Sequence, residues 1–132
     1  MTNLAALKVS DLMTTNVITA RIEDTMDLAD LDMKLAHIRH IPVVDGQNQV
    51  VGIVSDRDIL RAFGALGDSS LIIGAVMTDR VETIEASAPA RQALKIMLER
   101  KISCLPVRDP HGSLVGVITE TDFMRLLFES MT

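Results

Sequence analysis

The chain has 132 residues, 48% of them apolar, and a formal net charge of −5, so it has the size and the apolar content of one ordinary globular domain. The acidic charge and the lack of any aromatic residue except three Phe argue against binding of single-stranded or duplex nucleic acid. A single Cys excludes an intrachain disulfide, and neither a signal peptide nor an apolar run of membrane-spanning length is present, so we expect a cytoplasmic protein without a membrane partner.

The first half of the chain predicts a strand, a helix, a hairpin and a second helix. Residues 17–19 are predicted to be extended, and residues 25–38 to be helical. β-branched runs at 41–44 and 50–54 predict a hairpin, and the last helix begins near Ser55. The apolar face of the first helix is expected to consist of Leu28, Leu31, Leu35 and Ile38.

The second half predicts the same order of elements. Residues 81–83 are extended, residues 88–100 form a helix, the turn at 110–113 joins two strands, and the last helix begins near Thr119. Its first helix has an apolar stripe of Ala93, Ile96 and Met97. The expected N-caps of the two first helices are Asp24 and Ser87.

An internal duplication with a constant offset of 64 residues explains this similarity. Three fragments recur in register: LMT at 12–14 as VMT at 76–78, IPVVD at 41–45 as LPVRD at 105–109, and VGIVS at 51–55 as VGVIT at 115–119. We predict an α+β fold of two β-α-β-β-α repeats, 1–63 and 73–132, joined by a linker at 64–72. A repeat of about 60 residues is marginal alone, so the two sheets are expected to pack with pseudo-two-fold symmetry and to form clefts that suit small ligands.

The repeated pattern resembles the cystathionine β-synthase (CBS) domain. Its elements here are Met-Thr, a helix, apolar-Pro-Val-x-Asp, and Val-Gly-apolar-apolar-Ser/Thr-x-x-Asp. Two tandem copies resemble a free-standing Bateman module, a regulatory unit. The resemblance implies reversible binding of adenosine derivatives such as AMP, ADP, ATP or S-adenosylmethionine, homodimer formation, an unidentified effector protein, and no required cofactor.

The Ser/Thr-x-x-Asp corner of each repeat supports two compatible interpretations. Ser55 with Asp58, and Thr119 with Asp122, have the spacing of a capping box, which needs no ligand. The same helix N-terminus offers N–H groups to a phosphate, and the carboxylate offers acceptors to ribose hydroxyls. The resemblance implies that these four residues contact the ribose and phosphate.

Further site residues follow from the resemblance. In the first repeat the adenine slot is implied at Thr14, Val17, Ile18, Ile41 and Pro42, and in the second at Thr78, Val81, Leu105 and Pro106. Plain core packing is the alternative for the apolar ones. Basic residues beside the first slot, Arg39 and His40, are candidate ligand contacts, with His37 and Lys101 as further candidates for phosphate. Ser103 replaces Arg39 in the second repeat, so we expect the first repeat to supply most of the phosphate charge.

No catalytic or metal-binding residues are predicted. His37 and His40 give only two ligands, and Cys104 lacks an orienting partner for nucleophilic chemistry. P-loop and Rossmann glycine motifs are missing, so we do not expect an enzyme. The alternative function is a structural or dimerisation module without nucleotide, for which the apolar residues at 123–128 are the candidate contact.

Overall fold

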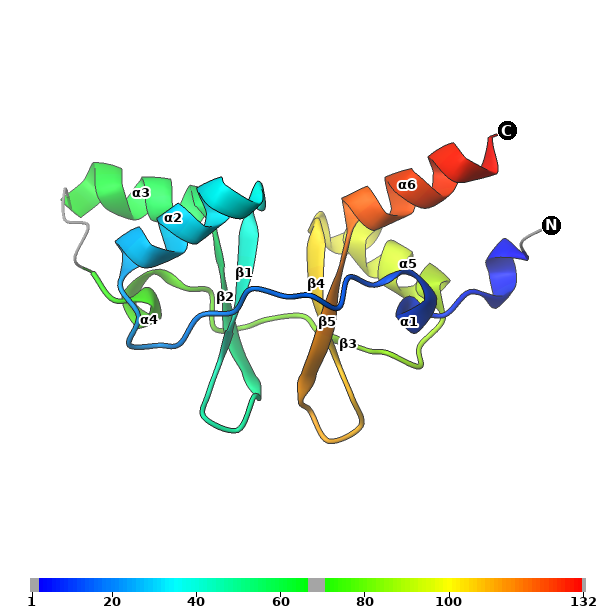
Figure 1. Ribbon diagram of the computed structural model, residues 1–132, viewed down its shortest axis with the longest axis horizontal. Coiled ribbons are helices and arrows are strands. Elements are labelled where there is room, and N and C mark those ends of the chain that lie inside the picture. Colours follow the sequence, from blue (N-terminus) through cyan, green and yellow to red (C-terminus); the bar gives the residue numbers. More distant parts are fainter. Residues whose placement is uncertain (1–2, 67–70, 132) are drawn as a thin grey trace. The chain divides into compact units, whose positions relative to one another are not determined.

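The computed structural model describes residues 3–66 and 71–131. The chain packs into two compact units, Ile18–Val81 and Met1–Val17 together with Glu82–Thr132, which we call the central unit and the split unit (Figure 1). Both combine helices with a small sheet, as predicted. Of the predicted linker at 64–72, residues 64–66 belong to a helix and residues 67–70 lie outside the described residues.

The central unit contains the hairpin and the helices expected from the first repeat. Strands β1 (His40–Val44) and β2 (Val50–Ser55) pair antiparallel, with Ile41 opposite Val54. Helices α2 (Met26–Ala36), α3 (Asp56–Leu66) and the short α4 (Ile73–Val76) complete it. The extended segment predicted at 17–19 forms no strand; a single parallel bridge joins Ala20 to Val43 instead.

The split unit repeats this arrangement with a third strand. Its sheet has the order β3-β4-β5, in which β3 (Ile84–Glu85) is parallel to β4 (Cys104–Arg108) and β4 is antiparallel to β5 (Leu114–Thr119). The helices α5 (Ala90–Arg100) and α6 (Glu120–Ser130) match the predictions. The short helices η1 (Leu4–Ala6) and α1 (Val9–Leu12), like α4, were not predicted, because one turn of helix leaves no periodicity to detect.

The predicted N-caps are wrong by one or two residues. Thr25 is the N-cap of α2, since the Asp24 carboxylate accepts the Arg21 N–H at 2.8 Å and closes the preceding turn. Pro89 is the N-cap of α5, two residues after Ser87. Its φ of −59° is compatible with the first turn of a helix.

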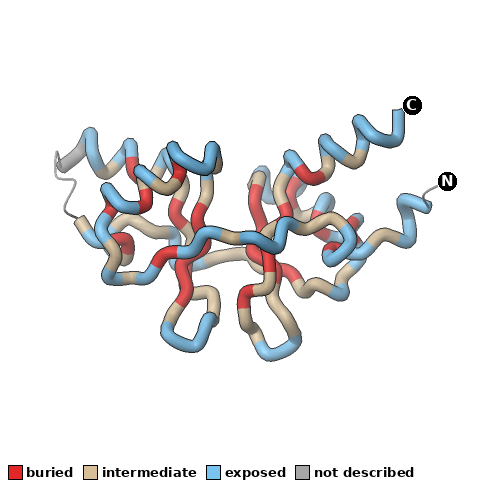
Figure 2. The backbone as a smooth tube through the Cα atoms, viewed as in Figure 1, coloured by how far each residue is buried: buried red, intermediate tan, exposed pale blue. Residues whose placement is uncertain are grey.

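Each unit has its own hydrophobic core, and β1 and β4 are buried along most of their length, whereas β2 and β5 mix buried and half-buried residues (Figure 2). In α5 the predicted stripe is confirmed: Ala93 and Met97 are buried and Ile96 is half-buried. Of the apolar face predicted for α2, Ile38 packs against the core, but the three leucines do not enter it. The buried residues are Met26, Ala29 and Met33, whereas Leu28, Leu31 and Leu35 are 48%, 51% and 72% exposed.

The segments around the two Met-Thr pairs are exchanged between the repeats. Helix α1 packs with α5 and α6, and its Val9 is fully buried in the core of the split unit (Figure 1). Helix α4 packs with α2 and α3, and Ile73 is fully buried in the central core. Each unit is therefore completed by a segment that belongs, in the sequence repeat, to the other half.

Candidate functional site

The Ser55 corner joins β2 directly to α3 in the central unit. The Ser55 N–H donates to Asp58 Oδ2 at 2.9 Å, and the Asp58 N–H donates to Ser55 Oγ at 3.1 Å. This reciprocal pair is a capping box, as the spacing predicted. The N–H of Asp56 donates to the Arg39 carbonyl at 3.0 Å, and the N–H of Arg57 donates to the Asp56 carboxylate at 2.9 Å. The first-turn N–H groups expected to be free for phosphate thus have partners.

The Thr119 corner has the same construction in the split unit. The Thr119 N–H donates to Asp122 Oδ2 at 2.8 Å, and α6 begins with a complete capping box. The Glu120 N–H donates to the Ser103 carbonyl at 3.1 Å, as Asp56 does to Arg39. Asp122 is the one charged side chain that is buried in the part of the chain that the structure describes.

The glycine of each Val-Gly pair lets a Met-Thr segment lie against the hairpin. The backbone N–H groups of Thr14 and Val117 donate to each other's carbonyls at 2.8 and 2.9 Å, and Ile53 and Thr78 pair in the same way at 2.9 Å. A Cβ on Gly116 would lie 2.8 Å from the Thr14 carbonyl oxygen, and one on Gly52 would lie 3.0 Å from that of Thr78. A side chain at either position would therefore force the Met-Thr segment to shift away from the hairpin. Both glycines stand in the repeated Val-Gly pattern, but nothing in the sequence indicates this close approach.

This exchange changes which predicted residues come together. Thr14 was grouped with Ser55 and Asp58, but its hydroxyl donates to Asp122 Oδ1 at 3.2 Å. Thr78 was grouped with Thr119 and Asp122, but it pairs with the strand that leads to Ser55. The repeat boundary alone cannot indicate this, since it assumes that each copy folds on itself.

The predicted basic residues lie near the ends of α2 and α5. His37 and Lys101 are exposed C-caps in the left-handed region, with φ of 56° and 55°. Arg39 is exposed, and its carbonyl already binds the first turn of α3, so its side chain starts beside the Ser55 corner. His40 is directly opposite Ser55 in the β-ladder.

The predicted apolar slot residues are unequally accessible. Ile41, Pro42, Leu105 and Pro106 are fully buried, and the side chains of Ile41 and Leu105 belong to the cores of their units. Val17 and Val81 are half-buried, and Ile18 is 36% exposed. The side chains of Val17, Val81 and Ile18 therefore have accessible apolar surface on which a flat ring can pack.

Cys104 occupies the position in the split unit that His40 occupies in the central unit, opposite Thr119. Burial, and to a smaller extent the negative charge of Asp122, raise the pKa of its thiol to about 12. A thiol with that pKa is fully protonated at neutral pH and is a poor nucleophile. Among the described residues, no group of three or more His, Cys, Asp or Glu could hold a metal ion.

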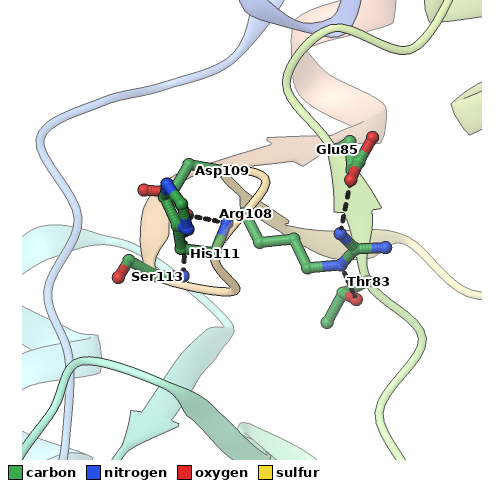
Figure 3. Close-up of polar contacts among 6 residues, drawn as sticks. All are labelled: Thr83, Glu85, Arg108, Asp109, His111 and Ser113. Atoms are coloured by element: carbon green, nitrogen blue, oxygen red, sulfur yellow. Dashed lines mark hydrogen bonds and ion pairs between the residues drawn. The ribbon is translucent and has the colours of Figure 1, made fainter.

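A separate polar cluster surrounds Arg108 at the end of β4 (Figure 3). Its guanidinium donates to Glu85 Oε1 at 3.0 Å and to Thr83 Oγ1 at 3.1 Å, which ties β4 to the segment around β3. In the adjoining turn, Asp109 Oδ1 accepts the N–H groups of His111 and Ser113. The first repeat has Val44 at the position of Arg108, so the Arg108 contacts have no counterpart there. The turn does have one, since Asp45 Oδ1 accepts the N–H groups of Gln47 and Gln49.

Comparisons with known proteins agree with this architecture. The model of the CBS domain matches residues 9–65 and 73–129. An uncharacterised 17.7 kDa protein of Acidianus ambivalens is 32% identical over 127 residues, which are 96% of this chain and 77% of that protein. The inosine-5'-monophosphate dehydrogenase of Halobacterium salinarum is 38% identical over 104 residues, which are 79% of this chain but only 20% of the enzyme.

Two solved structures resemble the whole chain. The CBS domain pair of protein MJ0100, in complex with 5'-methylthioadenosine and S-adenosyl-L-methionine, is 29% identical with a TM-score of 0.84, and the match covers 94% of this chain and 98% of that one. The protein CBSX2 in complex with AMP is 26% identical with a TM-score of 0.85, covering 96% and 100%. In this chain, none of the helices within the described ranges is long and apolar enough to cross a membrane.

Proposed function

Because the chain belongs to the CBS domain family, with two CBS domains in tandem, we propose that it is a regulatory module that binds adenosine derivatives reversibly and makes or breaks no bond. The observation that carries this proposal is the duplicated strand-to-helix corner with a capping Ser or Thr and a carboxylate three residues later. Structures of two similar CBS domain pairs contain AMP, or 5'-methylthioadenosine and S-adenosyl-L-methionine, and this supports the proposed ligand class. Regulation would follow from preferential binding to one conformation or assembly.

The residues at each corner have the chemistry that an adenosine ligand requires. Asp58 and Asp122 supply carboxylate acceptors for the vicinal hydroxyls of ribose, and each is held in position by its own capping box. Arg39 begins beside the Ser55 corner and supplies a guanidinium for phosphate, whereas Ser103 takes that place beside Thr119. We therefore propose that phosphorylated ligands prefer the Ser55–Asp58 site.

A thermal-shift assay with AMP, ADP, ATP, 5'-methylthioadenosine and S-adenosylmethionine tests the proposal. A ligand at 100 times its Kd adds about 2.7 kcal/mol of stability. The variants Asp58→Asn and Asp122→Asn keep an oxygen for each capping box but lose the charge, so the double variant is expected to lose the shift. Asp27→Asn is the matched control, since Asp27 is an exposed carboxylate in the first turn of α2 and belongs to neither capping box.

The second candidate function is a dimerisation module without nucleotide. The observation in its favour is the exposed apolar surface of α6, which includes Met124, Leu127 and Phe128. We propose that this surface forms a homodimer contact in the cytoplasm. Dimerisation would then be a function in addition to ligand binding, or the function that replaces it. Sedimentation of Leu127→Ser should then show a monomer. If wild-type protein is dimeric and no adenosine derivative shifts its melting, this second function replaces the first.

A further inference from the structure

We infer that Thr14 controls access of a ligand to the Asp122 carboxylate, so that the two sites fill in order and the Ser55–Asp58 site fills first. This inference rests on the proposed function, because it concerns how the same two carboxylates receive a ribose. It comes from a difference between the two corners that the sequence repeat conceals.

The Asp122 carboxylate has a donor at each of its acceptor positions. Oδ2 accepts the backbone N–H of Thr119 at 2.8 Å and its hydroxyl at 3.3 Å. Oδ1 accepts the Thr14 hydroxyl at 3.2 Å and the Arg125 guanidinium at 3.4 Å. A carboxylate has about four lone-pair positions. A ribose diol needs two of them, so it must displace Thr14, Arg125 or both.

The Asp58 carboxylate is less occupied and more accessible. Oδ2 accepts the Ser55 N–H at 2.9 Å, while Oδ1 forms an ion pair with Arg61 at 3.7 Å, beyond hydrogen-bond range. The hydroxyl of Thr78, which is equivalent to Thr14, makes no hydrogen bond within the described ranges. The Asp58 side chain is 15% exposed and that of Asp122 is 4% exposed. The Asp58 carboxylate can therefore accept hydrogen bonds from a ribose without first losing a hydrogen bond to the protein.

Thr14, rather than Arg125, makes the difference between the corners. Arg125 and Arg61 are equivalent, i+3 from their carboxylates, and largely exposed, so both sites carry an exposed cation. Two backbone hydrogen bonds join Thr14 to Val117, and they fix the position from which the Thr14 hydroxyl reaches Asp122. Hydrogen bonds to a charged group are among the stronger ones, so breaking this bond lowers the affinity of the Asp122 site. Thr14 is thus a positioning residue that holds Asp122 closed.

Calorimetry on variants that isolate the Asp122 site tests this inference. In an Asp58→Asn background, AMP and 5'-methylthioadenosine should bind about tenfold more tightly after Thr14→Val, since the competing hydroxyl bond to a charged group is removed. Thr14→Ser keeps the hydroxyl and should restore the original affinity. Thr15→Val makes the same chemical change one residue along, on an exposed side chain, and should leave the affinity unaltered.

The melting temperature of the ligand-free protein gives a second readout. Thr14→Val should lower it, because a hydrogen bond is lost, while it tightens ligand binding; a purely structural role would weaken both. Thr14→Ala serves as the second variant and should behave in the same way. Unchanged or weaker binding in both variants overturns the inference and leaves the proposed function intact. If no adenosine derivative binds to the wild-type protein, the proposed function itself fails.

Discussion

At the scale of single residues, the ionisation of Cys104 differs between the folded and unfolded chain. A free thiol ionises near pH 8.5, but burial and the charge of Asp122 raise the pKa of Cys104 to about 12. Between these values the unfolded chain has lost the proton that the folded chain keeps. The stability that this thiol contributes is therefore fully present below about pH 8.5 and is lost as the pH rises towards 12.

We predict that the unfolding free energy of the wild-type protein falls more steeply between pH 9 and 11 than that of Cys104→Ala. The difference in slope is at most about 1.4 kcal/mol per pH unit, since one proton is involved. Urea unfolding at several pH values measures it, and the absence of Tyr removes one overlapping titration. Parallel pH profiles for the two proteins would show that Cys104 does not keep its proton in the folded state.

Individual site residues could be predicted where the chemistry is local in the sequence. Ser55 with Asp58 and Thr119 with Asp122 form their capping boxes because three residues separate the partners on the first turn of a helix. The bond from Thr14 to Asp122 spans 108 residues, and nothing in the spacing of either residue indicates it. The missed contact distinguishes the Asp122 carboxylate from that of Asp58.

At the scale of elements, α2 shows how an apolar period can indicate the wrong face. Leucines recur along it with helical spacing, yet the core takes Met26, Ala29 and Met33. Ala29 lets the helix approach the sheet closely, and the flexible Met side chains fill the remaining space. The extent of α2 was predictable from its helix-forming residues, whereas its buried face depends on the partners that pack against it.

The contact between a Met-Thr segment and a hairpin yields an element-scale prediction. Gly116→Ala should lower the unfolding free energy by about 1–3 kcal/mol, because the new methyl group overlaps the Thr14 carbonyl and the Met13 side chain. Gly64→Ala is the control. Gly64 lies in α3, and a Cβ added there would meet no neighbouring atom within 4 Å. This variant should raise the unfolding free energy by up to about 1 kcal/mol, since alanine restricts the unfolded chain.

Urea unfolding measures both changes, and amide exchange at Thr14 and Val117 locates the first. These two amides should exchange faster in Gly116→Ala, because the bridge that protects them is strained. Equal stability of Gly116→Ala and wild type would mean that the segment does not depend on this close approach.

The whole molecule can be divided in two ways, by the sequence repeat or by the packing of the chain. The family model follows the sequence repeat, with matches at 9–65 and 73–129, whereas packing assigns residues 18–81 to one unit. The repeat could be found from the sequence, since short fragments recur at one offset. The exchange could not be found, because it depends on where Val9 and Ile73 are buried.

We predict that a fragment of residues 18–81 unfolds cooperatively, whereas a fragment of residues 1–64, equal in length, does not. The first contains the whole central core, including Ile73, and keeps the bonds from Met26 to Leu71 and from Ile53 to Thr78. The second loses these contacts and carries Val9, whose core partners lie in the other unit. A unit of this size is marginal, so we expect about 3 kcal/mol for the first fragment. Circular dichroism in urea compares them, and equal stability of the two fragments would show that the sequence repeat, not the exchanged unit, is what folds.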